Sequence, residues 1–486
     1  MTRTVLTEDR ENFRVLGHRM IDGLHTFLNG VDSGPADKPV PDDQRRKLAN
    51  LELPESGMAP EDIIDFIVHD VMPWRLGTTH RQSYAWVNSP PAPVAILAEA
   101  AAHTINCGLD GYDHGSMFLF ASLQRWLVDL TGFGDGPEVF AILFSGGTAA
   151  NLNALTAARQ QAAMNDGWDM RKEGLQSGRP KMVAYASDQV HSSVQRCVEQ
   201  LGIGSENLRS VPTGDDFRMQ TDTLEEMIAA DKSAGHRPFA VVGSAGTTNV
   251  GAIDPLHAIA DIAEREQLWF HVDGAYGGLG GLDPEYAGQY DGMTRVDSLT
   301  VDPHKWMHVP QDCGAMITRR KSVHSAAFNL TPDYLSKATD NGAPWPYDYM
   351  LQLTYADRAL KTFATLARLG RRGMADIVAR NNRCADTLGK LVEDAADMEL
   401  LSPVSLSVVN FRYVPVSGDR EDAALDALNG RIAEAIAESG EAHMPSTKVR
   451  GRTALRACIL HHENDDDDMH RLIALVRRLG SELTAA

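Results

Sequence analysis

Apolar residues near the start of the chain recur at spacings of three and four. Between about residues 8 and 29 the apolar positions are Phe13, Leu16, Met20, Leu24 and Phe27. This spacing places them on one face of an amphipathic helix. Loops that contain proline and glycine follow, in "SGPADKPVPDD" and "LPESGMAP". The N-terminal part is therefore expected to be an appendage, and its apolar face is expected to pack on a partner subunit.

From about residue 139 onward, short apolar runs alternate with stretches of helical pattern. The run "VFAILF" leads into "GGTAANLNALTAARQQAAM", "MVAYA" leads into "HSSVQRCVEQLG", and "PFAVVGS" precedes "PLHAIADIAEREQ". The runs "LWFHVD" and "SLTVD" come next. Continuous apolar strands that alternate with helices predict an α/β fold with a mostly parallel central sheet flanked by helices.

The same pattern divides the chain into three parts. We expect an N-terminal helical segment over residues 1–90, a large domain over 91–375 and a smaller C-terminal α/β domain over 376–486. Strands are expected in the last part at "LSVVNFRYV" and "TALRACIL". Residues 329–353 show no clear period and contain Gly342, Pro344 and Pro346, which is typical of a lid over a site.

Charge and cysteine content indicate which partners and which cellular compartment are to be expected. The 486 residues include 46 basic and 66 acidic ones, and the net charge of −20 disfavours nucleic acid and anionic membranes as partners. No uninterrupted apolar run approaches the ~18 residues that span a bilayer. The five cysteines are odd in number and form no CxxC pair, which indicates reduced thiols. We expect a soluble, cytoplasmic protein.

Polar and small residues follow the predicted strands at the points where those strands end. They are Ser145–Thr148, His191, Gly246–Thr248, Asp273 and Lys305. Parallel sheets bind ligands at the carboxyl ends of their strands, so these residues are candidates for one site. Glycines before a helix let the backbone approach an anion, and the helix start offers free N–H groups. A phosphate monoester would suit the stretch "SGGTAANL", which has neither a GK[ST] nor a GxGxxG motif.

Asp273 and Lys305 end neighbouring apolar runs and allow two interpretations. They could form a simple ion pair, although a buried pair stabilises a fold little more than apolar packing does. Together with a phosphate site they would also fit one cofactor. Pyridoxal phosphate needs a phosphate cradle, an anion at its ring nitrogen and a lysine for a Schiff base.

Five motifs in order carry a resemblance to a known family. "FSGGTAANL", "SDQVHSSVQ", "AGTTNVGAID", "HVDGAYGG" and "DPHKW" resemble the group II pyridoxal-phosphate-dependent amino-acid decarboxylases, and most of all the aromatic L-amino acid decarboxylase branch. The resemblance runs from about residue 70 to the end of the chain. It implies fold type I, which is similar to aspartate aminotransferase, and a homodimer with active sites at the subunit interface.

The resemblance also implies roles for single residues. Lys305 corresponds to the Schiff-base lysine, Asp273 to the carboxylate at the ring nitrogen, and His191 to the histidine that stacks on the ring and orients the departing carboxylate. Tyr334 corresponds to the lid tyrosine that returns a proton to the substrate carbon. The other residues implied at the cofactor are Gly147, Thr148, Thr248, Ala275, Asp302 and His304, and the candidate substrate contacts are Trp86 and Asn88 together with His191.

The chain departs from the best-known members at a few positions. Asp302 stands where animal enzymes carry asparagine, Gly274 where they carry alanine, and "AWVNS" where aromatic-specific enzymes are more aromatic. We therefore predict decarboxylation of an L-amino acid, with an aromatic side chain favoured. The alternatives are an aldehyde synthase on the same scaffold, which decarboxylates and also deaminates oxidatively, and a decarboxylase of an acidic amino acid, for which His80 and Arg81 could supply charge.

Two further interpretations of the C-terminal part remain. An aminotransferase would need an arginine for the substrate carboxylate, and Arg450, Arg452 and Arg456 keep that reaction open. The stretch "HHENDDDDMH" places histidines beside carboxylates, but an acidic helix start explains it without a metal, and we expect no metal site.

Overall fold

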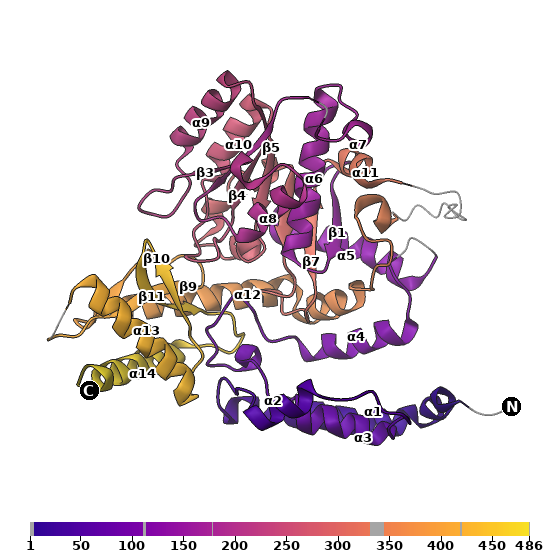
Figure 1. Cartoon of the computed structure of the whole chain (residues 1–486), viewed down its shortest axis with the longest axis vertical. Helices are drawn as coiled ribbons and strands as arrows, with labels where there is room; N and C mark the ends of the chain where they lie inside the picture. Colours follow the sequence, from indigo (N-terminus) through magenta and orange to yellow (C-terminus); the bar gives the residue numbers. More distant parts are fainter. Residues whose placement is uncertain (1–3, 110–112, 177, 331–344, 418–419, 486) are drawn as a thin grey trace.

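The alternating apolar runs form one seven-stranded sheet in the computed structural model, which describes residues 4–109, 113–176, 178–330, 345–417 and 420–485. The strand order is β1-β7-β6-β5-β4-β2-β3 (Figure 1). From β3 to β6 the neighbours pair in parallel, whereas β7 lies antiparallel between β1 and β6. The strands are β1 (Phe140–Phe144), β2 (Met182–Ser187), β3 (Leu208–Val211), β4 (Arg237–Ser244), β5 (Trp269–Asp273), β6 (Ser298–Val301) and β7 (Gly314–Thr318).

Helices cover both faces of this sheet because successive strand residues point to opposite sides. In β2, Val183 and Tyr185 join a buried apolar cluster with side chains of α5, α9 and α10, whereas Ala184 and Ala186 join a cluster with α6 and α8. The helices of this domain are α5 (Gly115–Thr131), α6 (Gly147–Asn165), α7 (Met170–Glu173), α8 (Ser192–Gln200), α9 (Thr221–Ser233), α10 (Leu256–Glu266) and α11 (Lys321–Phe328).

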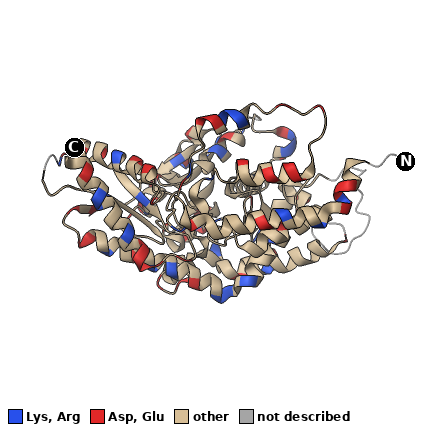
Figure 2. Ribbon diagram, turned by 90° about the horizontal axis from the view of Figure 1, so that it is seen from below, with Lys and Arg blue, Asp and Glu red and all other residues tan. Residues whose placement is uncertain are grey.

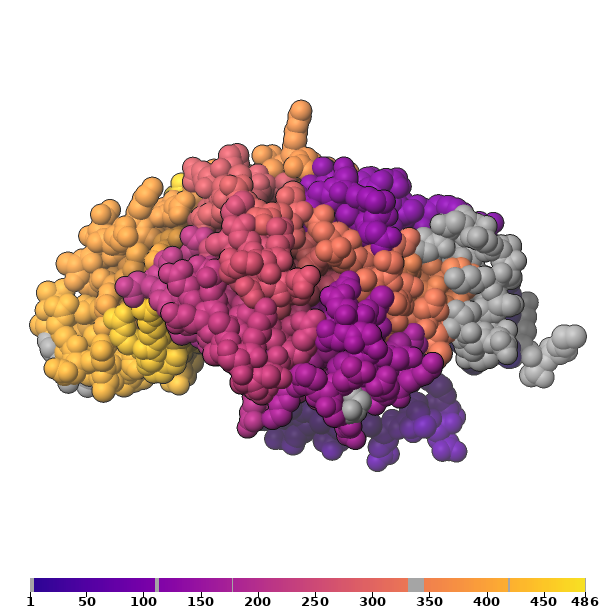
Figure 3. All heavy atoms as spheres, turned by 90° about the horizontal axis from the view of Figure 1, so that it is seen from above, coloured from indigo at the N-terminus to yellow at the C-terminus, as the bar shows by residue number. Residues whose placement is uncertain are grey.

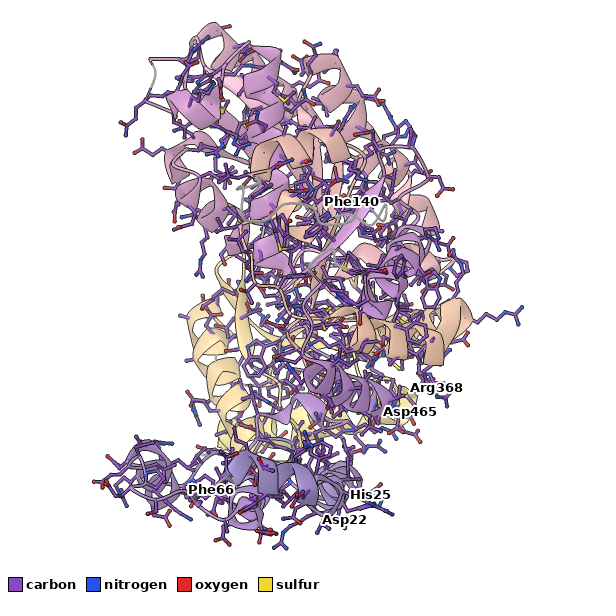
Figure 4. The ribbon with its side chains drawn as sticks, turned by 90° about the vertical axis from the view of Figure 1, so that its right-hand side faces the viewer. Asp22, His25, Phe66, Phe140, Arg368 and Asp465 are labelled. Carbon is purple, nitrogen blue, oxygen red and sulfur yellow. The ribbon has the colours of Figure 1, made fainter. Side chains whose placement is uncertain are left out.

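The segment predicted to be a lid returns to the core at its C-terminal end. Residues 331–344 lie outside the described part of the chain, and Tyr334 with them. The following turn, Pro346–Tyr349, is buried. The ring centroid of Tyr349 lies 4.5 Å from that of Phe140, which is labelled in Figure 4, and 5.6 Å from that of His324. The described end of the segment is therefore anchored against β1 and α11.

A second, antiparallel sheet forms the smaller C-terminal part, which occupies one end of the molecule (Figure 3). Its strand order is β10-β11-β9-β8, and helices α13 and α14 share its apolar cluster. The acidic run predicted to start a helix does so, with Asp466, Asp467 and Asp468 in the first turn of α14. The elements are β8 (Met398–Leu400), β9 (Val408–Tyr413), α13 (Asp422–Ser439), β10 (Ser446–Val449), β11 (Arg452–Cys458) and α14 (Asp466–Ala485).

One long helix, α12 (Ala359–Glu393), runs from the large sheet to the small one (Figure 1). It contacts α4 and α5 beside the large domain, and α14 and β9 in the C-terminal part. Its helical path is interrupted at Gly370, where φ is 63°. A positive φ is easy for glycine, so this residue permits the kink. The predicted boundary between residues 375 and 376 falls inside this helix.

The N-terminal helices lie apart from the large sheet (Figures 1 and 4). They are α1 (Val5–Gly30), α2 (Asp42–Ala49) and α3 (Pro60–Phe66), and α4 (Pro93–Ile105) follows beneath the large domain. Helix α1 packs on α3 but buries none of its own residues, so the predicted appendage keeps an exposed apolar surface. The exposed apolar side chains in this region include Leu6, Phe13, Val15, Ile21 and Leu28 on α1, Leu97 and Ile105 on α4, and Phe118 on α5.

Lysine, arginine, aspartate and glutamate are interspersed over the face shown in Figure 2. No helix among the described residues combines the length and the apolar character needed to cross a membrane.

Candidate active site

A cavity of about 300 Å³ opens where the parallel strands of the large sheet end. Every residue predicted at the cofactor contributes to its wall. Those lining residues are Gly147, Thr148, His191, Thr248, Asp273, Ala275, Asp302, His304 and Lys305. They come together because β2, β4, β5 and β6 run in parallel, so that their carboxyl ends meet at one edge.

An anion cradle lies at the start of α6. The helix begins at Gly147, directly after β1, so the free N–H groups of its first turn and its positive dipole end face the cavity. A Cβ atom on Gly147 would lie 2.9 Å from Oδ2 of Asp302 and 3.3 Å from Cβ of Ala275. Only glycine therefore fits this position, and the backbone there can approach a phosphate closely.

Asp273 is a buried, hydrogen-bonded carboxylate at the end of β5, with 8% of the residue exposed. Its Oδ1 accepts a hydrogen bond from the backbone N–H of Ala275 at 3.1 Å, and its Oδ2 accepts one from Nδ2 of Asn151 at 2.9 Å. These bonds fix the direction of the carboxyl group. A cationic ring nitrogen is the kind of group that such a carboxylate would hold.

Lys305 is paired with Asp302 and not with Asp273. Its Nζ lies 3.2 Å from Oδ2 of Asp302, whose side chain is only 2% exposed. The ion pair that the sequence allowed between Asp273 and Lys305 is therefore absent from the described contacts, and each of the two groups has a separate partner. Oδ1 of Asp302 is buried and has no hydrogen-bond partner among the described residues.

Two histidines border the cavity with opposite constraints on Nδ1. His191 follows β2 and caps α8, and its Nδ1 accepts a hydrogen bond from the backbone N–H of Ser193 at 3.2 Å. Burial lowers the pKa of His191, although Asp273 opposes the shift. His304 donates from Nδ1 to the carbonyl oxygen of Cys313 at 2.6 Å. At neutral pH His191 therefore presents a neutral ring to the cavity.

The structure does not bring all predicted site residues together. Trp86 is 41% exposed and lies edge-on to His443, with ring centroids 5.2 Å apart, and neither Trp86 nor Asn88 lines the cavity of its own chain. Of the two residues considered for an acidic substrate, His80 is buried and does not line the cavity, and Arg81 donates from Nε to Asp468 at 2.8 Å. It is directed at the start of α14.

The arginines of an aminotransferase interpretation have other partners. Arg450 pairs with Asp215 at 2.9 Å and Arg452 with Glu399 at 2.9 Å. Arg456 donates from Nε to the carbonyl oxygen of Asn249 at 3.2 Å. None of the three arginines lines the cavity. Within the described ranges, no group of three or more histidine, cysteine, aspartate or glutamate side chains could hold a metal ion.

Several polar residues of the site were not predicted from the sequence. Asn151 and Ser193 line the cavity, and His271 lies buried behind it. Asn151 follows Gly147 by one helical turn, so the i, i+4 spacing on α6 could have placed it on the cavity side. Ser193 lies two residues after His191, which is the N-cap residue of α8. A residue at this position commonly forms a hydrogen bond with the side chain of the N-cap residue.

The residues present fit pyridoxal phosphate. The glycine turn suits a phosphate, Asp273 suits a protonated ring nitrogen, and Lys305 supplies the amine for a Schiff base. The unpaired Oδ1 of Asp302 adds an acceptor beside Lys305 that a bound ligand could satisfy.

Comparisons with known proteins agree with this fit. The pyridoxal-dependent decarboxylase conserved domain matches residues 41–414. A relative named aromatic-L-amino-acid decarboxylase, from Bacillus atrophaeus, is 28% identical over 98% of this chain and 96% of its own length. A phenylacetaldehyde synthase of Arabidopsis thaliana is 28% identical over 93% of this chain and 92% of its own length.

The fold agrees as well. A structure of Oryza sativa TDC with PLP and tryptamine superposes with a TM-score of 0.91 at 24% identity, over 99% of this chain and 100% of that one. This likeness confirms the predicted fold type I class. The family match covers most of the chain and extends across both Asp273 and Lys305. The chain therefore belongs to the pyridoxal-dependent decarboxylase family and is a carboxy-lyase whose cofactor is pyridoxal phosphate.

Proposed function

We propose that this enzyme removes the α-carboxylate of an aromatic L-amino acid and releases the corresponding amine and carbon dioxide. The observation that carries the proposal is the meeting of the glycine turn, Asp273 and Lys305 in one cavity. Pyridoxal phosphate, when bound, supplies the ring that accepts the electron pair left behind by the departing carboxylate.

Each residue of the chain then has a defined task. Lys305 would hold the cofactor covalently through Nζ and would release it when the substrate amine takes its place. Asp273 keeps a proton on the ring nitrogen, and an anion ~4 Å from that nitrogen is worth about 4 kcal/mol at an effective dielectric constant near 20. Gly147 and Thr148 would bind the phosphate, and His191 would pack against the ring.

The remaining predicted residues complete the cofactor site. Ala275 would leave room for the ring because its side chain is a single methyl group. Thr248 would contact the cofactor, and its carbonyl oxygen is held by the guanidinium of Arg456. Asp302 and His304 flank Lys305, and Asp302 balances the charge of the lysine when the amine is free.

The preference for an aromatic side chain is supported by the relatives and by charge. Among the described residues that line the cavity, Lys305 is the single lysine or arginine, and it is committed to the cofactor. A substrate with an acidic side chain would need a further cation, and Arg81 is engaged by Asp465 and Asp468. Trp86 and Asn88 stay candidate substrate contacts outside the cavity of the single chain.

An activity screen tests the proposal. The purified enzyme, supplied with pyridoxal phosphate, is incubated with each of the twenty amino acids, and amine, aldehyde, carbon dioxide and peroxide are measured in the same reaction. We expect equal amounts of amine and carbon dioxide from an aromatic substrate, without peroxide. Aldehyde with peroxide would assign the enzyme to the synthases instead, and conversion of glutamate or aspartate alone would refute the aromatic preference.

Tyr334→Phe is expected to divert the reaction without stopping the loss of carbon dioxide. Tyr334 lies outside the described residues, and its proposed task, to deliver a proton to the substrate carbon, comes from the family resemblance. Without that proton, oxygen takes the electron pair. One amino acid, one O₂ and one water then yield one each of aldehyde, ammonia, carbon dioxide and hydrogen peroxide. The measurement is the ratio of amine to peroxide, and an unchanged amine yield would assign the proton to another group.

We also propose that the enzyme is a cytoplasmic homodimer with active sites at the interface. The apolar side chains of α1 support this, since Phe13 is 65% exposed and no residue of the helix is buried. Contiguous exposed apolar surface usually marks a contact with another chain. Four of the five cysteines are buried and all are free, which supports a reducing compartment.

Sedimentation equilibrium tests the dimer. The wild type should sediment with twice the mass of the chain, and Phe13→Asp should shift it toward the monomer because a charge would be buried in the contact. Arg14→Asp changes the charge at the neighbouring exposed position and serves as the control. A wild-type protein that sediments as a single chain would refute this assembly.

A further inference from the structure

Six side chains in the wall of the cavity and behind it form one continuous hydrogen-bonded chain. Nε1 of Trp269 lies 2.8 Å from Oγ of Ser298, which lies 2.8 Å from Nδ1 of His271. Nε2 of His271 lies 3.0 Å from Oδ1 of Asn151. The chain continues through Ser193 to His191, and a branch at Asn151 reaches Asp273. All of these residues except His191 are buried.

The direction of the first bonds follows from chemistry. An indole N–H can only donate, so Oγ of Ser298 accepts from Trp269. The single hydroxyl proton of Ser298 is then free to donate to Nδ1 of His271. Nδ1 of His271 also lies 3.2 Å from the carbonyl oxygen of Ser298, which can only accept, so the contacts of Nδ1 do not by themselves place the ring proton. Burial lowers the pKa of His271 to about 4, so this ring is neutral in the physiological range.

The amide of Asn151 is oriented from both sides. Its Nδ2 lies 2.9 Å from Oδ2 of Asp273, and a carboxylate can only accept, so the amide N–H must face it. The opposite amide orientation would place two oxygens against each other at Asp273. Oδ1 of Asn151 therefore faces Nε2 of His271, and because an amide oxygen can only accept, the ring proton of the neutral His271 is on Nε2. Nδ1 of His271 then accepts from the hydroxyl of Ser298.

The second amide proton of Asn151 serves the other side of the cavity. Nδ2 also lies 3.0 Å from Oγ of Ser193, and that oxygen lies 2.8 Å from Nδ1 of His191. Because Ser193 accepts from Asn151, its own hydroxyl proton is available for His191. The ring proton of a neutral His191 is then on Nε2. One amide is therefore linked to two residues that the proposed function places at the cofactor.

We propose that Asn151 is a positioning residue, held in orientation by His271, that fixes Asp273 as a carboxylate directed at the ring nitrogen of the cofactor. The inference rests on the proposed task of Asp273. The hydrogen bond of 2.9 Å from Nδ2 of Asn151 fixes the direction in which Asp273 presents its carboxyl group to the cavity. Without Asn151, Oδ2 of Asp273 would lose its side-chain donor and its fixed direction.

Two cofactors that differ at one atom isolate this effect. The full-length protein, stripped of cofactor, is titrated with pyridoxal phosphate and with its 1-deaza analogue, in which carbon replaces the ring nitrogen. The dissociation constant of the 1-deaza analogue divided by that of pyridoxal phosphate measures what the ring nitrogen contributes to binding. General damage to the site weakens both cofactors alike and leaves the ratio unchanged, whereas loss of the carboxylate contact lowers it.

The variants are Asn151→Leu and His271→Leu, with His271→Gln as the conservative replacement whose amide N–H can still donate to Asn151. We expect each leucine variant to lower the ratio about tenfold, as for the loss of one hydrogen bond to a charged group. The glutamine variant should stay near wild type. Asn153→Leu is the matched control, because Asn153 is a buried asparagine of the same helix that donates only to the carbonyl oxygen of Ala149.

Asp273→Asn tests the proposed task of Asp273 separately from that of Asn151. If this variant lowers the ratio while both leucine variants leave it unchanged, Asn151 has a structural task only and the inference is overturned. If Asp273→Asn itself leaves the ratio unchanged, Asp273 does not serve the ring nitrogen, and both its proposed task and the inference are overturned. Should Asn151→Leu fail to fold, the two variants of His271 still decide the matter.

Discussion

Lys305→Ala is expected to abolish covalent cofactor binding and to lower turnover by roughly 10⁴-fold or more. Lys305 is the single lysine among the described residues that line the cavity, so no neighbouring amine can replace it. The measurements are the visible absorbance of the protein-bound cofactor and the release of carbon dioxide. Lys172→Ala, at an exposed position in the same domain, is the control and should leave both unchanged. Normal turnover by Lys305→Ala would refute the assignment of the site.

Lys305→Ala should also lower the stability of the protein because Lys305 is in contact with Asp302. Without Lys305, the buried carboxylate of Asp302 loses the ammonium 3.2 Å away. An unpaired buried group costs about 1–3 kcal/mol, so the melting temperature of the cofactor-free variant should fall. A second change, Asp302→Asn, removes that charge and should restore the melting temperature but not the activity. This double variant therefore separates folding from chemistry.

Asp273→Asn is expected to keep the fold and to lower turnover by about a thousandfold. The expectation follows from the roughly three pKa units by which an anion ~4 Å away stabilises a protonated ring nitrogen. The amide retains most of the shape of the side chain, and it can still accept the N–H of Ala275. The measurement is kcat for carbon dioxide release with the cofactor at saturation.

A matched control distinguishes this carboxylate from buried carboxylates in general. Asp283 is buried in the same domain, accepts a hydrogen bond from Asn382 at 2.8 Å and does not line the cavity. Asp283→Asn should therefore change stability more than turnover. If Asp273→Asn stayed within a few-fold of the wild type, the ring nitrogen would not depend on Asp273.

The main sheet could be predicted because its parallel strands are short apolar runs separated by helices. The strand β7 was not foreseen. "GAMIT" follows the lysine loop without a helix between them, and its antiparallel direction is set by pairing with β1 on one side and β6 on the other. The short strand β3 was missed because it is only partly buried and lacks a continuous apolar run.

The site could be predicted in part for a related reason. Residues at the ends of parallel strands must meet, so Asp273 and Lys305 were placed correctly in one cavity. The partners of these residues could not be read from local pattern. Asn151 reaches Asp273 across 122 positions of sequence and His271 across 120. Such contacts are decided by the packing of α6 on the sheet and by nothing in the neighbouring residues.

Arg81 shows that proximity along the chain does not establish proximity to the site in the fold. It lies just before "AWVNS" in the sequence, which left open a task at the substrate. In the folded chain its guanidinium binds Asp465 and Asp468, because the acidic first turn of α14 comes beside it. The run of aspartates starts a helix, as expected from the sequence, and it also supplies the carboxylates that bind this arginine.

The position of β1 at the edge of the sheet has a consequence for the order of folding. Among the described strands its only neighbour is β7, so Phe140 pairs with Thr318, and β1 stays without this partner until nearly two thirds of the chain has been synthesised. The strands from β2 to β6 can assemble earlier as successive parallel units. Within the large sheet, the glycine turn after β1 would therefore be fixed only when β7 has paired, later than the strand end that carries Asp273.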